Sequence, residues 1–173
     1  MSETNNTKRA KTFGFARSLI EGWALLGGIL LLAVVAMNVI SVIGTVVWKP
    51  FAGDFEMTQV GLAVAIFSFL PYCQLTRSNV TADIFTAKLS QRWVAGFTFI
   101  AALVALAFSL LLAWRMYYGM LDQKDYEYTT IVLRFPHWIA YIPILFSLVL
   151  LAIAALITSS ETLSEIRKAN TNG

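Results

Sequence analysis

Four long apolar stretches dominate the chain, and shorter polar segments separate them. They cover residues 23–48, 57–75, 93–114 and 138–158, and no acidic or basic residue interrupts any of them. A helix that crosses a hydrocarbon core about 30 Å thick needs about 20 mostly apolar residues. Each stretch meets that length, so the pattern predicts an all-α integral membrane protein with four transmembrane helices.

The segments between the apolar stretches carry weaker patterns. Residues 11–20 and 79–92 mix apolar and charged positions at helical spacing, which favours two short interfacial amphipathic helices. Residues 115–135 read as the longest loop between two spans, and Pro136 is expected in the first turn of the last helix. We therefore treat residues 1–173 as one membrane domain, with polar tails at 1–22 and 159–173.

The composition agrees with burial in lipid. Hydrophobic residues make up 58% of the chain and charged residues 13%, with a mean hydropathy of +0.69. Soluble domains carry about 25% charged residues. The single cysteine, Cys73, and the single histidine, His137, cannot build a disulfide framework or a metal site of several His and Cys ligands. We expect no cofactor, no metal, no enzymatic activity and no nucleic-acid partner, but contact with membrane lipids.

All five tryptophans stand at the ends of the apolar stretches. An indole ring prefers the boundary between headgroups and hydrocarbon, where its N–H stays hydrated. This placement uses different residues from the hydropathy pattern and supports the same four spans. The expected interface anchors are Trp23, Trp48, Trp93, Trp114 and Trp138.

Basic residues predict the orientation. Nine of the 13 lysines and arginines fall in the two tails and in the loop between the second and third spans, and four fall on the opposite side. Cytoplasmic segments carry the excess of Lys and Arg. Both termini are therefore expected in the cytoplasm, and the protein in a bacterial inner membrane.

Few polar side chains lie inside the spans. Asn38, Ser41 and Thr45 form a weakly polar stripe on the first span, which suits either an ion or substrate ligand or a hydrogen-bonded seam between helices. We favour the seam, because no carboxylate accompanies the stripe. Gly61 and Ala65, four residues apart on the second span, would let two helices approach closely.

Charged residues at the span ends allow more than one interpretation. Glu56 would favourably meet the helix dipole in the first turn of the second span, or bind a cation of a neighbouring subunit. Arg77 and Asp83 would either attach the cytoplasmic loop to a partner or remain solvated. These alternatives stay open from the sequence alone.

Three short runs together resemble one family of membrane proteins. They are Asn38-Val39-Ile40 followed by Pro50-Phe51-Ala52-Gly53-Asp54-Phe55-Glu56, then Arg77-Ser78-Asn79-Val80-Thr81-Ala82-Asp83-Ile84, then Thr130-Ile131-Val132-Leu133-Arg134-Phe135-Pro136-His137-Trp138-Ile139-Ala140-Tyr141-Ile142-Pro143. In this order and spacing the chain is similar to the small membrane subunit of tripartite ATP-independent periplasmic (TRAP) transporters. It departs at Ser78-Asn79, where many members carry glycine and a basic or imidazole residue.

The resemblance implies a component of a larger transporter. A large multi-spanning subunit would move an organic acid with sodium ions, a periplasmic substrate-binding protein would deliver it, and this chain would brace the former and help to dock the latter. An acidic, tyrosine-rich outer surface suits recognition of a soluble protein. The docking residues expected on this basis are Asp54, Glu56, Asp122, Asp125, Tyr126, Glu127 and Tyr128.

Two other functions remain as alternatives. The chain could be a scaffold subunit of another inner-membrane complex, which the sequence excludes only through the family resemblance. It could also be a small homo-oligomeric exporter, although that mechanism needs a membrane-embedded carboxylate, and the apolar stretches have none.

Overall fold

The computed structural model describes the backbone of residues 2–47, 49, 51–76 and 91–171, and side chains within 14–163 of these ranges except at 91–93 and 95. The described residues form four helices, α1 (Ser2–Val47), α2 (Asp54–Leu75), α4 (Gln91–Asp125) and α5 (Trp138–Thr171). Each contains a segment long and apolar enough to cross a membrane. The predicted all-α fold with four such helices is therefore confirmed.

The helices extend beyond the predicted apolar stretches. Residues 11–20 belong to α1 without a break, so the predicted lead-in is not a separate helix. Most of the second predicted interfacial helix, residues 79–92, lies outside the described residues. Trp48, at the end of the first predicted span, lies outside them as well.

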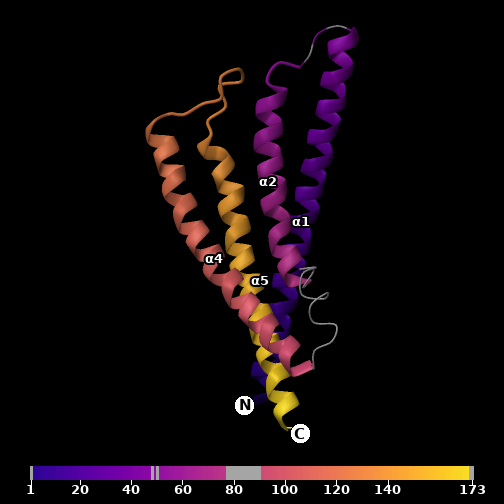
Figure 1. Ribbon diagram of the computed structural model, residues 1–173, viewed down its shortest axis with the longest axis vertical. Coiled ribbons are helices and arrows are strands. Elements are labelled where there is room, and N and C mark those ends of the chain that lie inside the picture. Colours follow the sequence, from indigo (N-terminus) through magenta and orange to yellow (C-terminus); the bar gives the residue numbers. More distant parts are fainter. Residues whose placement is uncertain (1, 48, 50, 77–90, 172–173) are drawn as a thin grey trace.

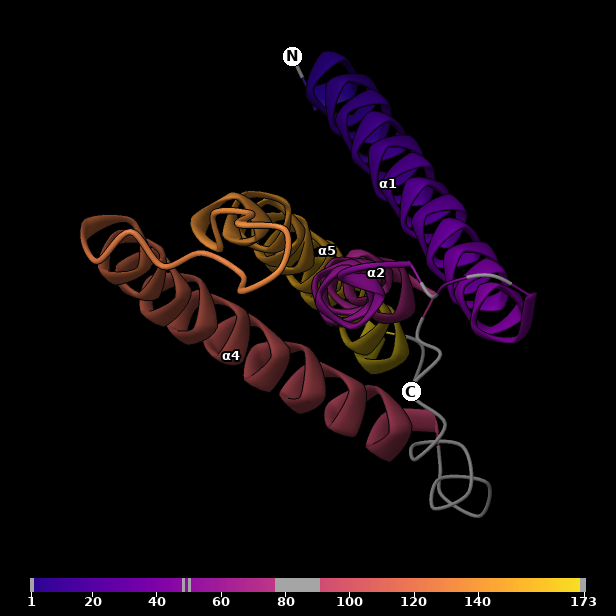
Figure 2. The same ribbon diagram turned by 90° about the horizontal axis from the view of Figure 1, so that it is seen from above.

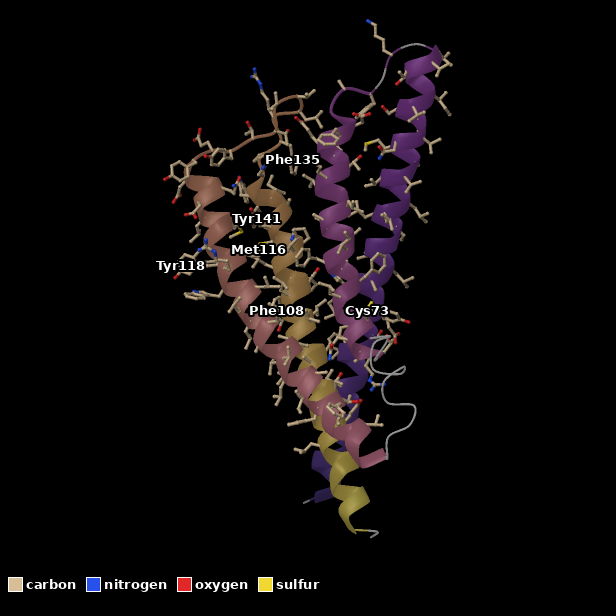
Figure 3. The ribbon with its side chains drawn as sticks, viewed as in Figure 1. Cys73, Phe108, Met116, Tyr118, Phe135 and Tyr141 are labelled. Atoms are coloured by element: carbon tan, nitrogen blue, oxygen red, sulfur yellow. The ribbon has the colours of Figure 1, made fainter. Side chains whose placement is uncertain are left out.

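The prediction of a loop over residues 115–135 is wrong for its first half, because α4 continues to Asp125. Apolar positions recur past Trp114 and keep contact with α5. There a Cβ added at Gly119 would lie 3.5 Å from Cε1 of Tyr141. Figure 3 shows Met116 and Tyr141 between α4 and α5, while Tyr118 projects away from α5. Packing against α5 thus extends α4 through a segment whose acidic residues had favoured a loop.

The helices contact one another in the spatial order α4–α5–α2–α1 (Figure 1). Seen from above in Figure 2, α5 and α2 lie in the middle, with α4 and α1 on opposite sides. Buried residues make up 33% of the most apolar part of α5 but 11% in α1 and in α4. The arrangement is therefore an open row, with α5 as its best-buried member.

Small residues allow α1 and α2 to pack closely. A Cβ added at Gly27 would lie 2.6 Å from Ser68 Cβ, and one added at Gly61 would lie 2.5 Å from Val34 Cγ2. Ala65 on the same face of α2 is completely buried. The close approach predicted for Gly61 and Ala65 thus joins α2 to α1 within the chain.

The two ends of the row differ. Both termini lie at one end, here called the terminal end, and the α1–α2 and α4–α5 connections lie at the other, the hairpin end (Figure 1). At the terminal end α1 also reaches α5, where Ile20, Leu150 and Ala154 form a buried cluster. The functional candidates divide between these two ends.

Candidate functional site

The α4–α5 connection forms a compact turn, here called the 128–137 hairpin. Thr129 and Pro136 pair across it in an isolated antiparallel bridge, and the His137 N–H donates to the Tyr128 carbonyl at 3.1 Å. Pro136 is thus part of the hairpin and not, as was expected, of the first turn of the helix, whereas α5 begins at Trp138, the predicted start of the fourth span. Backbone hydrogen bonds therefore hold the hairpin closed at its base, directly before α5 begins.

Thr130 organises the tip of this hairpin from the inside. Its N–H donates to the Phe135 carbonyl at 3.0 Å, and its hydroxyl accepts the Phe135 N–H at 2.9 Å. Its carbonyl accepts the Arg134 N–H at 3.1 Å, and Arg134 adopts a positive φ of 51°. Thr130 is buried, whereas Ile131 beside it is 93% exposed.

Glu56 joins the hairpin to α2. Its carboxylate accepts the Val132 N–H at 2.8 Å through Oε1 and the Leu133 N–H at 3.1 Å through Oε2. The residue stands in the first turn of α2, as the helix-dipole interpretation required, but its partners are backbone groups of the hairpin. No residue pattern indicates these partners, because any residue except proline supplies a backbone N–H.

The α1–α2 connection meets the same hairpin. Gly53 adopts a φ of 85°, and a Cβ there would lie 2.6 Å from Leu133 Cγ. Asp54 turns toward α1, where its Oδ2 accepts the Ser41 hydroxyl at 2.5 Å and its Oδ1 accepts the Phe55 N–H at 2.7 Å. Two expected docking acids, Asp54 and Glu56, are thus engaged within the chain.

The polar stripe of α1 faces α2. The Asn38 amide donates to Thr58 Oγ1 and to the Val34 carbonyl, both at 2.8 Å. Ser41 bonds Asp54, as described, and Thr45 donates to the Ser41 carbonyl at 3.0 Å. Asn38 and Ser41 therefore form an interhelical seam with α2, whereas the exposed Thr45 bonds its own helix. The expectation that no carboxylate accompanies the stripe is wrong, because Asp54 at the start of α2 supplies one.

The remaining docking candidates lie near the end of α4 and along the hairpin. Asp122 and Asp125 stand in the last turns of α4, while Tyr126, Glu127 and Tyr128 follow it, and all five are exposed. The Tyr126 and Tyr128 rings lie 5.9 Å apart, and Glu127 adopts a positive φ of 50°. These side chains form one acidic and aromatic edge.

A shallow groove of about 400 Å³ runs beside the hairpin, between α2 and the start of α5. Its walls are mostly apolar, with few polar groups. Residues of all three segments line it, among them Phe55, Gln59, Ala63, Thr130, Ile131 and Ala140. Among the described residues, no three His, Cys, Asp or Glu side chains are grouped so that they could hold a metal ion.

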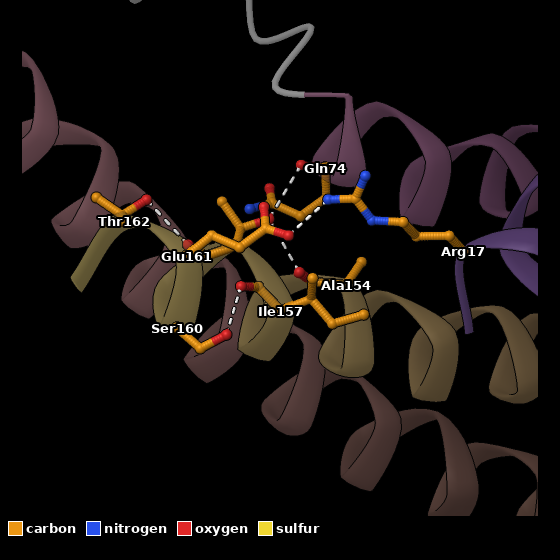
Figure 4. A network of polar contacts seen from close by, with 8 residues as sticks. Arg17, Gln74, Ala154, Ile157, Ser160, Glu161 and Thr162 are labelled. Carbon is orange, nitrogen blue, oxygen red and sulfur yellow. Dashed lines mark hydrogen bonds and ion pairs between the residues drawn. The ribbon is translucent and has the colours of Figure 1, made fainter. Parts of the chain in front are cut away.

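The terminal end holds contacts that sequence reasoning missed. Arg17 Nη2 and Glu161 Oε1 form an ion pair at 2.6 Å between α1 and α5 (Figure 4). In the same region Thr158 Oγ1 donates to the Gln74 carbonyl of α2 at 3.4 Å. These partners lie far apart in the sequence, so no local pattern could pair them.

The tryptophans do not share one environment. The Trp23 indole N–H donates to Ser147 Oγ at 2.8 Å, and its ring packs edge-on against Phe146. Trp114 is exposed, and Lys124 lies over the Trp138 ring at 5.8 Å from its centre. The Trp93 side chain, Trp48, Arg77 and Asp83 lie outside what the structure describes.

The fold and surface define a small multi-pass membrane protein whose helices present broad apolar surfaces. Residues 34–165 match the family model described as tripartite ATP-independent periplasmic transporters, DctQ component. The chain belongs to this family of transporter components, as the sequence motifs indicated. Comparison with curated proteins and with solved structures gave no match.

Proposed function

We propose that the chain braces the large sodium-coupled subunit of a TRAP transporter and helps to dock its periplasmic binding protein during organic-acid uptake. In this proposal both termini are cytoplasmic, and the hairpin end faces the periplasm of a bacterial inner membrane. In this proposal the membrane-spanning segments are residues 23–48, 57–75, 93–114 and 138–158.

One observation carries the proposal: the spans offer no group that could accompany a charged solute through the membrane. Such a path needs ionisable or strongly polar groups at mid-membrane. Here the apolar stretches contain no acidic or basic residue, and Asn38 and Ser41 are occupied by the seam with α2. An accessory role therefore fits better than transport by this chain alone.

The acidic and aromatic edge supports docking of a soluble partner. Exposed charges steer association and set specificity, and tyrosine contributes large contact area. The five exposed candidates, Asp122, Asp125, Tyr126, Glu127 and Tyr128, lie together at the hairpin end. Asp54 and Glu56 lie at the same end, but they would support docking indirectly, through their hydrogen bonds within the chain.

Reconstitution tests the accessory role. The full chain alone, in liposomes with an inward sodium gradient, should take up no organic acid, whereas the chain with the large subunit and the binding protein should. Purification of the tagged chain in mild detergent should recover the large subunit. Gradient-driven uptake by the chain alone would contradict the proposal and favour an exporter-like carrier.

Charge reversal tests docking. Replacing Asp122, Asp125 and Glu127 by Lys should weaken binding-protein association about tenfold, because each exposed charge contributes up to about 1 kcal/mol. Recovery of the large subunit should not change. Glu21→Lys, an exposed acid of α1 toward the terminal end, is the matched control and should leave docking intact. If the triple variant bound the binding protein as well as Glu21→Lys does, the acidic edge would not be part of the docking surface.

A further inference from the structure

The carboxylate of Glu56 is directed into the protein's own hairpin. Its two oxygens accept the N–H groups of two successive residues, Val132 and Leu133, at 2.8 and 3.1 Å. The partners are 76 and 77 residues away in the sequence. One side chain therefore connects the start of α2 to the tip of the connection between α4 and α5.

The two N–H groups of the hairpin tip form a contact that favours a negatively charged acceptor such as the Glu56 carboxylate. Successive backbone N–H groups in a turn form a concave site for negative charge, and hydrogen bonds to a carboxylate are stronger than those to a neutral acceptor. Glu56 also stands in the first turn of α2, where the helix dipole favours a negative charge. Both carboxylate oxygens thus already accept a hydrogen bond from the hairpin, which fixes the direction of the Glu56 side chain.

The contact fixes more than the tip of the hairpin. Leu133 lies against Gly53, so the hairpin and the α1–α2 connection meet without space for a Cβ. At the base, the His137 N–H holds the Tyr128 carbonyl, and the Tyr128 ring lies 5.9 Å from that of Tyr126. Between tip and base, Thr130 bonds the backbone of Phe135 and Arg134, so the member of the exposed edge that these contacts reach is Tyr128.

We propose that Glu56 is a positioning residue, which holds the 128–137 hairpin and thereby positions Tyr128, the residue at which this hairpin joins the edge formed by Asp122, Asp125, Tyr126, Glu127 and Tyr128. The part of this inference that concerns docking rests on the proposed function. The part that concerns the hairpin stands on the geometry alone. Glu56 then affects the binding protein without touching it.

Amide hydrogen exchange of the full chain in detergent measures the hairpin directly. In Glu56→Ala, the Val132 and Leu133 amides should exchange at least about tenfold faster, because both lose a charged acceptor. Glu56→Gln keeps one acceptor oxygen and should give an intermediate rate. It also serves where the alanine variant folds poorly. Gln59→Ala, one turn further along α2 in the wall of the same groove, is the matched control and should leave both amides unchanged.

Binding-protein association is then measured on the complex with the large subunit. It should weaken in the order Glu56→Gln then Glu56→Ala, in parallel with the exchange rates, and remain unchanged in Gln59→Ala. Weaker association with unchanged exchange would make Glu56 a direct contact and overturn the inference. Unchanged exchange and unchanged association would overturn it as well.

Two further outcomes separate the inference from the proposed function. Faster exchange with unchanged association would remove the hairpin from the docking surface, so the docking part would fail while the hairpin part stands. If the unaltered complex did not bind the binding protein at all, the proposed docking function would fail. The exchange rates would still decide whether Glu56 holds the hairpin.

Discussion

The terminal end and the hairpin end of the row are held together by different chemistry. At the terminal end, side chains of α1 and α5 meet directly, through the buried cluster of Ile20, Leu150 and Ala154 and through Trp23 and Ser147. At the hairpin end, side chains of α1 and α2 bind backbone groups of connecting segments. Buried apolar contacts therefore contribute at the terminal end, beside polar contacts such as those of Trp23 and Thr158, whereas the connections at the hairpin end are held mainly by hydrogen bonds to the backbone.

The difference shows where each end is vulnerable. Many small apolar contacts stabilise a packed cluster together, so the loss of one hydrogen bond beside it should cost little. A turn held by a few hydrogen bonds and one close approach depends strongly on single residues. The following variants test this contrast, beginning with the largest expected effect.

Among the substitutions at Gly53, at Trp23 and at the Arg17–Glu161 pair, Gly53→Ala should lower the stability of the protein most. Alanine pays about 1–2 kcal/mol for the left-handed conformation at φ 85°, and its Cβ would lie 2.6 Å from Leu133 Cγ. We expect a loss of about 2–3 kcal/mol, measured by thermal unfolding in detergent. Adding Leu133→Ala should recover part of it by removing the close contact.

The matched control for this substitution is Gly22→Ala, where an added Cβ meets no atom within 4 Å. It should unfold at or slightly above the temperature of the unaltered protein, because alanine favours helix. A loss equal to that of Gly53→Ala would show that the hairpin end is not specially sensitive.

Trp23→Phe tests the cluster at the terminal end. It keeps an aromatic ring against Phe146 but removes the indole N–H that donates to Ser147 Oγ. Ser147 Oγ still donates to the Pro143 carbonyl, so no group is left without a partner. The expected loss is about 0.5–1 kcal/mol, measured by the same unfolding experiment. A loss above that of Gly53→Ala would reverse the contrast between the ends.

The ion pair of Arg17 and Glu161 should have the smallest effect. Its side chains are 46% and 37% exposed, and solvent screens such pairs. A double-mutant cycle with Arg17→Gln and Glu161→Gln should give a coupling energy between 0 and about 1 kcal/mol, decreasing as salt is added. A larger, salt-independent coupling would show that the pair is shielded from water.

The sequence predicted the parts of the structure that follow from local composition. Hydropathy located the four apolar helices, and the small residues Gly61 and Ala65 indicated the close face of α2. The polar stripe at Asn38 was predicted to form a seam. Each of these rests on residues a few turns apart on one helix, where spacing alone determines which side chains share a face.

The contacts of the two ends could not be predicted in the same way. Glu56 binds backbone N–H groups, which carry no residue signature, and Trp23 finds Ser147 124 positions away. The same indole that suits a lipid headgroup also suits a hydroxyl on a neighbouring helix. The end of α4 was predicted too early, because the acidic residues after Trp114 are typical of a loop. Contact with α5 keeps this segment helical to Asp125.

The row of helices has a consequence for how a solute could pass. Helices arranged in a ring surround a common axis, but the four described helices form a row in the order α4–α5–α2–α1, which presents two sides. Even at the terminal end, where α1 returns to α5, the intervening space is filled by Ile20, Leu150 and Ala154. In the proposed function, a path for a solute beside this row would therefore be completed by the large subunit.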